Sequence, residues 1–142
     1  MKKRILILCT GNSCRSQMAE GFLKSFDENL EVYSAGTKPA AKVNPFAIKA
    51  MNEVGIDISN GVAEDVDKYL AQSFDFVITV CDNAKETCPV FMGDVKHRLH
   101  VGFDDPADAV GTEKEVMPVY RRVRDEIRRD FYQFYVKELK DK

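Results

Sequence analysis

Residues 5–16 decide the fold, and they read Ile5-Leu6-Ile7-Leu8-Cys9-Thr10-Gly11-Asn12-Ser13-Cys14-Arg15-Ser16. The first four form a continuous apolar and partly β-branched run, which is typical of a strand buried on both faces of a parallel sheet. A helix is expected to begin near Arg15 or Ser16, because apolar residues then recur at helical spacing, at Met18, Ala19, Phe22, Leu23 and Phe26. Cys9 is therefore expected at a turn from a strand into a helix.

The same alternation of strands and helices continues along the chain. Strands are expected at residues 32–35 and 76–80, a weaker strand at 96–103, and a short helix near 64–70. Asn44 followed by Pro45 is typical of a helix N-terminus, and Gly55 of the residue beyond the helix end. After a polar surface loop at 108–116, Pro118 is expected to open a long closing helix. The apolar stripe of that helix consists of Val119, Val123, Ile127, Phe131, Phe134 and Leu139. This order predicts an α/β fold with a parallel sheet.

Composition limits the kinds of partner. The 142 residues, of which 44% are hydrophobic, are expected to form one domain over residues 1–142. A net charge of −2 argues against nucleic acid as a partner. The apolar run at 5–8 is far shorter than a membrane span or a signal peptide, so a cytoplasmic protein without a membrane partner is expected. In that reducing compartment, the four cysteines indicate thiol or metal chemistry rather than permanent disulfides.

The loop after Cys9 has the features of an oxyanion site. Backbone N–H groups at a helix N-terminus and a guanidinium bind such anions well. Gly11 and Asn12 tolerate the left-handed backbone that such a loop needs, and Arg15 stands at the helix start. The residues expected to bind the oxyanion are Thr10, Gly11, Asn12, Ser13, Cys14, Arg15 and Ser16.

Cys9 would lie at the floor of this loop as a nucleophile. An ordinary thiol with a pKa of about 8.5 is only about 3% ionised at pH 7. The helix dipole, the loop amides, Arg15 and the Ser16 hydroxyl are all expected to lower the pKa and favour the thiolate. The spacing from Cys9 to Arg15 alone leaves an alternative open, in which Cys9 is a buried strand-end residue and Arg15 a surface residue.

Residues 9–16 resemble the phosphate loop of the low-molecular-weight protein tyrosine phosphatases. The continuation Ser16-Gln17-Met18-Ala19-Glu20 is more similar to their relatives, the thioredoxin-coupled arsenate reductases. This resemblance extends over nearly the whole chain, through residues 33–36, 43–45, 56–60, 81, 88, 102–107 and 121–127. It implies a four-stranded parallel sheet in the order 2-1-3-4, flanked by helices. It also implies arsenate as the small-molecule substrate, which Cys9 attacks.

The same resemblance implies that Cys81 and Cys88 relay electrons. Reduction of As(V) to As(III) takes two electrons, which two thiols supply when they become a disulfide. In the order 2-1-3-4, Cys81 ends a strand beside the first, and a strand spacing of about 4.8 Å would bring it near disulfide reach of Cys9. Cys88 would then take over the disulfide and present it to thioredoxin, the expected protein reductant. Without the resemblance, Cys81 could equally be a core residue and Cys88 incidental.

A general acid is expected at Asp105, which precedes Pro106 on a loop at the same sheet edge as Cys9. The alternative is a turn-forming Asp-Pro pair, and Asp104 is the nearer rival for the acid. The resemblance assigns the role to Asp105, the residue directly before the proline. Tyrosine phosphatases of this fold usually carry an aromatic residue after that proline, whereas Ala107 here fits a small inorganic substrate better.

No tightly bound cofactor is expected. The resemblance implies that a potassium ion could bind behind the loop, at Asn12, Glu20, Ser34 and either Glu64 or Asp65, with Glu64 favoured by spacing. The cysteines lack the paired short spacings of a zinc site, and His97 and His100 have no partner at ligand spacing. Cys14 is expected to be a bystander, with a protective disulfide to Cys9 as the alternative.

Two other functions compete with arsenate reduction. One is a low-molecular-weight phosphatase that hydrolyses phosphate monoesters through a phosphocysteine on Cys9, an activity that could also persist as a weak side reaction. The other is a thiol redox sensor that uses Cys81 and Cys88 to change a partner-binding surface. A monomer is expected in each case. The charged run of the closing helix is expected to form a solvated face with an Asp125–Arg129 pair; its arginines are Arg121, Arg122, Arg124, Arg128 and Arg129.

Overall fold

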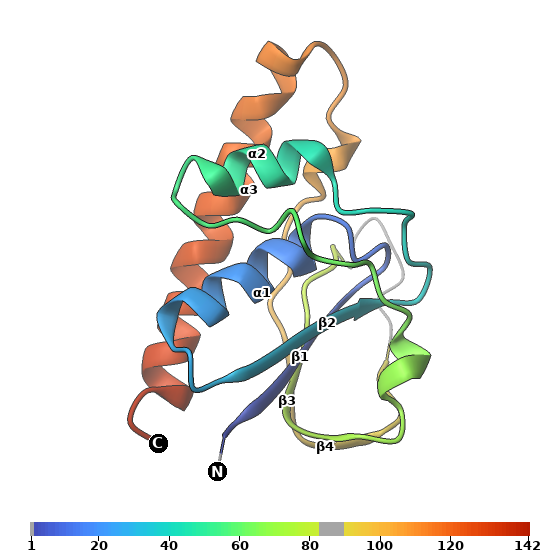
Figure 1. Ribbon diagram of the computed structural model, residues 1–142, viewed down its shortest axis with the longest axis vertical. Coiled ribbons are helices and arrows are strands. Elements are labelled where there is room, and N and C mark those ends of the chain that lie inside the picture. The colour runs from blue at the N-terminus through green and yellow to red at the C-terminus, as the bar shows by residue number, and fades with distance from the viewer. Residues whose placement is uncertain (1, 83–89) are drawn as a thin grey trace.

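The computed structural model describes residues 2–82 and 90–142 and contains one four-stranded sheet. Its strands are β1 (Arg4–Cys9), β2 (Glu31–Gly36), β3 (Ser73–Thr79) and β4 (Asp94–His100). They lie in the order β2-β1-β3-β4, and each neighbouring pair is parallel. The predicted order 2-1-3-4 is confirmed. Because all strands run the same way, their carboxyl ends meet at one edge, where β1 ends at Cys9 (Figure 1).

Three α-helices accompany the sheet: α1 (Arg15–Phe26), α2 (Pro45–Asn52) and α3 (Glu113–Phe134). Two short 3₁₀ helices, η1 (Val66–Tyr69) and η2 (Pro106–Asp108), lie in the connections, and a π-helical turn, η3 (Tyr135–Leu139), follows α3. The predicted start of α2 is confirmed: the Asn44 carboxamide oxygen accepts hydrogen bonds from the N–H groups of Phe46 and Ala47. No described helix has both the length and the apolar character that crossing a membrane requires.

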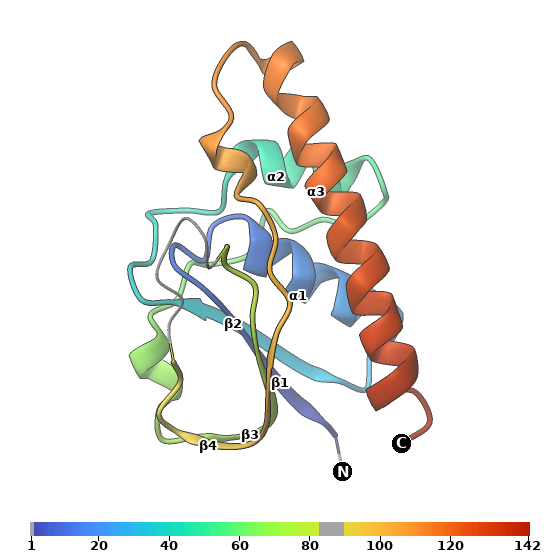
Figure 2. The same ribbon diagram turned by 180° about the vertical axis from the view of Figure 1, so that it is seen from behind.

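The central strand is buried on both faces, as predicted. Ile5 and Ile7 pack into the main core with the three α-helices, whereas Leu6 and Leu8 face a smaller cluster that includes Tyr69 of η1. The side chains of these four β1 residues are fully buried. Figure 2 shows α3 running along the length of the molecule on the side of α1, and both chain ends lie at the same end of the fold (Figure 2). Cys9 therefore ends a strand that pairs with a neighbouring strand on each side and packs against a hydrophobic cluster on each face.

Several element boundaries differ from those predicted. Strand β3 begins at Ser73 and β4 at Asp94, because backbone pairing between them extends into polar residues that carry no apolar signal. The helix α3 begins five residues before Pro118, inside the predicted surface loop. There the Thr112 N–H and hydroxyl both donate to the Glu115 carboxylate, and Val116 with Met117 is buried. The stabilisation from the cap and from burial of these side chains thus exceeds the cost of the one helix hydrogen bond that Pro118 cannot donate.

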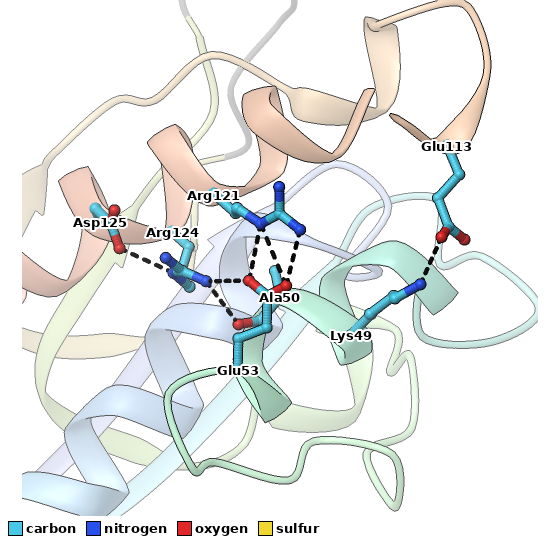
Figure 3. Close-up of polar contacts among 7 residues, drawn as sticks. All are labelled: Lys49, Ala50, Glu53, Glu113, Arg121, Arg124 and Asp125. Atoms are coloured by element: carbon cyan, nitrogen blue, oxygen red, sulfur yellow. Dashed lines mark hydrogen bonds and ion pairs between the residues drawn. The ribbon is translucent and has the colours of Figure 1, made fainter. Parts of the chain in front are cut away.

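The arginines of α3 do not all lie on a solvated face. Arg124 is buried and donates to the Ala50 carbonyl and the Glu53 carboxylate, both on or next to α2. Arg121 makes a bidentate pair with the same carboxylate (Figure 3). Arg129 pairs with Asp130, not with Asp125 as predicted. These contacts fasten α2 to α3, because two guanidinium groups share one acceptor.

Candidate active site

Cys9 lies at the carboxyl end of β1 with 3% of its surface exposed. The end of β2 approaches it closely, and Cys9 pairs with Gly36 in the parallel ladder. A Cβ atom at Gly36 would lie 2.3 Å from the Thr10 carbonyl oxygen, so only glycine fits at this position. The sheet thus fixes the position of the thiol and the start of the loop that follows.

The carbonyl groups of the loop are turned outward. Thr10, Gly11 and Ser13 accept hydrogen bonds from the N–H groups of Lys38, Ala40 and Asn44, at 3.0, 2.9 and 2.8 Å. The Asn12 carbonyl accepts from the Gln17 carboxamide at 3.1 Å. The segment from Lys38 to Asn44 therefore forms a strap along one side of the loop and holds its carbonyl groups.

The N–H groups of the loop point the opposite way. No described peptide bond is cis, and in a trans peptide the N–H is directed away from the carbonyl of the same unit. The N–H groups of residues 11–14 donate no hydrogen bond within residues 2–82 and 90–142. Of the two residues that tolerate a left-handed backbone, Asn12 adopts it, with φ +50°, and Gly11 does not. One left-handed residue suffices here to curve the loop into an anion-binding concavity.

Asn12 and Ser16 stiffen this concavity from behind. Both are fully buried, and the Asn12 carboxamide donates to the Ser16 hydroxyl oxygen at 2.7 Å. The Asn12 side-chain oxygen accepts from the Glu64 N–H at 2.8 Å. Since the bond from Asn12 uses the Ser16 oxygen as acceptor, the Ser16 hydroxyl keeps its proton for another partner.

Arg15 opens α1 with its side chain only 4% exposed. Its guanidinium donates to the Phe103 carbonyl at 3.2 Å and lies 3.4 Å from the Asp105 carboxylate. Asp104 instead pairs with Arg122 of α3 at 3.1 Å. Of the two candidate acids, the structure therefore brings Asp105 to the loop and turns Asp104 away. The alternative reading of Arg15 as a surface residue is wrong.

The second thiol of the loop, Cys14, stands at the N-terminus of α1. Burial raises its pKa well above the usual value, the Asp105 carboxylate and Cys9 raise it further, and Arg15 opposes them. Neither Cys14 nor Cys9 takes part in a disulfide. Because the high pKa keeps Cys14 protonated near neutral pH, it is a poor nucleophile.

Cys81 follows the strand beside β1. The Val80 N–H donates to the Leu8 carbonyl at 2.9 Å, which continues the pairing of β3 and β1 up to the residue before Cys81. Cys81 is fully buried, shares the core cluster of Cys9, and is disulfide-bonded. Cys88, the second predicted relay cysteine, lies outside the described residues. The structure thus brings one of the two predicted relay residues to the sheet edge of Cys9.

Three of the four predicted potassium ligands line one pocket of about 390 Å³, namely Glu20, Ser34 and Glu64. The Ser34 hydroxyl donates to Glu20 at 2.5 Å, and each carboxylate also holds a lysine, Lys24 at 2.6 Å and Lys68 at 3.1 Å. Asn12 does not line this pocket. Across the described residues, no group of three or more His, Cys, Asp or Glu is arranged to hold a metal ion.

Sequence reasoning missed two residues next to the loop, Asn44 as a loop contact and Tyr120. The Asn44–Pro45 pair predicted a helix start but gave no sign that its N–H would bind Ser13. Tyr120 is buried beside Asn44, and its hydroxyl oxygen accepts a hydrogen bond from the Asn44 carboxamide; the predicted apolar stripe did not include it. Burial, together with the nearby Cys14 and Asp105 and against the hydrogen bond from Asn44, raises its pKa to about 12. A tyrosine within the predicted closing helix was the available sequence signal.

A thiol at the end of a central parallel strand, followed by a loop with inward N–H groups and a buried arginine, is the arrangement typical of a phosphatase-type oxyanion site. The chain belongs to the low molecular weight phosphotyrosine protein phosphatase family, which matches residues 4–142.

Relatives of two kinds share this fold. A curated arsenate reductase of Halalkalibacterium halodurans is 54% identical over 127 residues, 89% of this chain and 90% of its own length. A solved arsenate reductase in the phosphate-binding state has a TM-score of 0.79 at 31% identity, covering 95% of this chain and 98% of that one. An arginine phosphatase, solved as a mutant with a phosphorylated active-site serine, has a TM-score of 0.76 at 25% identity, covering 98% and 97%.

Proposed function

We propose that this chain reduces arsenate to arsenite, with Cys9 as the nucleophile and thioredoxin as the reductant. The observation that carries the proposal is the place of Cys81, which directly follows the strand paired with β1 and shares a core cluster with Cys9. Hydrolysis of a phosphate ester needs no second cysteine there. The arsenate reductase names of the relatives at about half identity support the same choice.

In the first step, the Cys9 thiolate attacks arsenic in an arsenate held by the N–H groups of residues 11–14 and by Arg15. A sulfur–arsenic bond forms and one arsenic–oxygen bond breaks. Asp105 gives its proton to the leaving oxygen, which departs as water. Its position 3.4 Å from Arg15 supports this role, because the anion and the acid would then share one guanidinium.

In the second step, the Cys81 thiolate attacks the Cys9 sulfur. A Cys9–Cys81 disulfide forms, the sulfur–arsenic bond breaks, and its electron pair remains on arsenic, which leaves as arsenite. Cys88 then attacks Cys81 and releases Cys9 as a thiolate. The dithiol of thioredoxin reduces the remaining disulfide and is itself oxidised.

The direct test is arsenite formation from arsenate with thioredoxin, thioredoxin reductase and NADPH, compared with glutathione and glutaredoxin. Multiple turnovers are expected with the thioredoxin system, and Cys9→Ser should abolish them because an alcohol is not ionised near neutral pH. Turnover with glutaredoxin alone would overturn the thioredoxin coupling. Substantial activity in Cys9→Ser would overturn the whole mechanism.

The second candidate is hydrolysis of phosphate monoesters through a phosphocysteine on Cys9. It is favoured by the family itself and by the similarity to an arginine phosphatase. The same loop, Arg15 and Asp105 would serve both reactions, so a weak phosphatase side activity is part of the proposal. Ala107 beside Asp105 offers no aromatic surface for a substrate ring, which favours the inorganic substrate.

A potassium ion at Glu20, Ser34, Glu64 and Asn12 remains a proposal. The pocket that holds the first three supplies hard oxygen ligands, which suit such a cation. Binding would require Lys24 and Lys68 to give up their carboxylate partners. Calorimetric titration with potassium chloride against sodium chloride tests this site. The proposed protein is a cytoplasmic monomer.

A further inference from the structure

One buried tyrosine is connected to the oxyanion loop through Asn44. Tyr120 lies in the second turn of α3 with 3% of its surface exposed. Its hydroxyl oxygen accepts a hydrogen bond of 3.0 Å from the Asn44 carboxamide. Its ring packs against Phe46 of α2 at a centroid distance of 5.5 Å. Tyr120 thus contacts α2 at the residue that begins the helix.

Asn44 connects three parts of the fold through three separate groups. Its side-chain oxygen caps α2, its carboxamide N–H donates to Tyr120 of α3, and its backbone N–H donates to the Ser13 carbonyl. The last bond turns the Ser13–Cys14 peptide so that its N–H faces the concavity. The position of Asn44 therefore affects the direction of an anion-binding group.

The rest of α2 is fastened to α3 along its length. Lys49 pairs with Glu113 at 2.5 Å, and Glu53 pairs with Arg121 and Arg124 (Figure 3). Among these contacts, Tyr120 is the one that binds Asn44, and the Asn44 N–H in turn donates to the loop at Ser13. The pairs at the far end hold the helix, whereas Tyr120 holds the residue that touches the loop.

We propose that Tyr120 is a positioning residue for oxyanion binding, acting through Asn44 on the Ser13–Cys14 peptide. The proposal rests on the oxyanion site of the proposed function but not on arsenate chemistry. Without the hydroxyl, the partly buried Asn44 carboxamide loses its acceptor on α3, and the strap can shift away from the loop. The expected consequence is weaker anion binding while the sheet and the thiol remain in place.

Inorganic phosphate is the probe, with its dissociation constant measured by calorimetry on the reduced full-length chain. Tyr120→Phe is expected to weaken phosphate binding about three- to tenfold, the size of one lost hydrogen bond. Tyr132→Phe is the matched control, because Tyr132 lies on the same helix and is half-exposed. If the parent binds phosphate and Tyr120→Phe binds it with the same dissociation constant, the role of Tyr120 is overturned. The oxyanion site itself then still stands. A parent that binds no phosphate would instead overturn the proposed site, and with it this proposal.

A double-mutant cycle separates positioning from general loss of stability. Asn44→Ser keeps a helix-capping oxygen but removes the N–H donor to Tyr120. If the effect passes through Asn44, Tyr120→Phe adds little further loss of phosphate affinity in the Asn44→Ser background. Fully additive losses would overturn the proposed route. Asn44→Ser alone tests the same link if Tyr120→Phe is not folded at the temperature of the assay.

Discussion

At the scale of single residues, the site depends on one buried cation. Arg15 has almost no contact with solvent, and its guanidinium is held between the Phe103 carbonyl and Asp105. A buried charge of this kind is stable only with such partners. An incoming oxyanion would supply further acceptors for the same planar group, which explains why an arginine rather than a lysine suits this position.

Arg15→Lys is expected to weaken phosphate or arsenate binding about 10- to 100-fold. An ammonium group cannot make the two parallel bonds of a guanidinium, and charged hydrogen bonds of this kind contribute about 1.5–3 kcal/mol. Calorimetry with phosphate measures the effect. Arg122→Lys is the control, because Arg122 is half-exposed and pairs with Asp104. Equal affinity in the parent and Arg15→Lys would place Arg15 outside the binding site.

Asp105→Asn is expected to slow the first chemical step about 100-fold, since general acids contribute factors of about 10²–10⁴. Oxyanion affinity should change little or rise, because the variant removes a carboxylate 3.4 Å from Arg15. Single-turnover kinetics with arsenate, or with an aryl phosphate, would report the step. Asp104→Asn is the neighbouring control. A larger loss of rate in Asp104→Asn than in Asp105→Asn would show that Asp104 is the general acid.

At the scale of elements, α2 is a short helix whose position depends on α3. The eight residues of α2 are few for an isolated helix, so its position depends on packing and ion pairs. Glu53 lies just beyond its end and accepts hydrogen bonds from two arginines of α3 (Figure 3). The helix in turn places Asn44 at the loop. Contacts remote from Cys9 therefore support the geometry around it.

The ion pairs between Glu53 and the arginines of α3 predict that the free energy of unfolding depends on pH. Hydrogen bonds from Arg121, then from Arg124, lower the pKa of Glu53 to about 2 despite the opposing effect of burial. A carboxyl with a lowered folded-state pKa stabilises the protein above its unfolded pKa of about 4.3 and loses that contribution as the pH falls toward 2.

Glu53→Gln should therefore lower the Tm at pH 7, and the difference from the parent should shrink between about pH 4.3 and pH 2. Thermal unfolding followed by circular dichroism across that range measures it. Glu28→Gln, at an exposed position after α1, is the control. A Tm difference that stays constant down to pH 2 would contradict the assigned cause.

At the scale of the whole molecule, the repeated β–α pattern made the fold predictable. The apolar run before Cys9 and the helical spacing after Arg15 are local signals, and the parallel sheet in the order 2-1-3-4 followed from them together with the family resemblance. The start of α3 was not predictable from Pro118, because a capping interaction upstream outweighed the proline. The roles of Asn44, Tyr120 and Arg124 were hidden for another reason. Each depends on contacts between residues far apart in the sequence, such as Asn44 with Tyr120 at 76 positions and Arg124 with Ala50 at 74.

The arrangement of the whole sheet yields the sharpest prediction, which separates the relay from hydrolysis. Cys81→Ser and Cys88→Ser should each stop multiple turnover with thioredoxin. Both should leave hydrolysis of an aryl phosphate nearly unchanged, because hydrolysis needs only Cys9, Arg15 and the acid. Steady-state arsenite formation and aryl phosphate hydrolysis, measured on the same preparations, provide the two readouts, and Cys14→Ser is a third cysteine variant for comparison.

In the Cys88→Ser variant, a single exposure to arsenate should still produce a Cys9–Cys81 disulfide, since that attack precedes the step of Cys88. The adjacent strands β1 and β3 hold the two cysteines at one sheet edge, so the first disulfide needs no contribution from Cys88. Thiol blocking followed by mass mapping would identify the trapped bond and release of one arsenite per chain would accompany it. If both variants cycle with thioredoxin as fast as the parent, arsenate reduction by this relay is excluded. Hydrolysis of phosphate monoesters then becomes the function that the site supports.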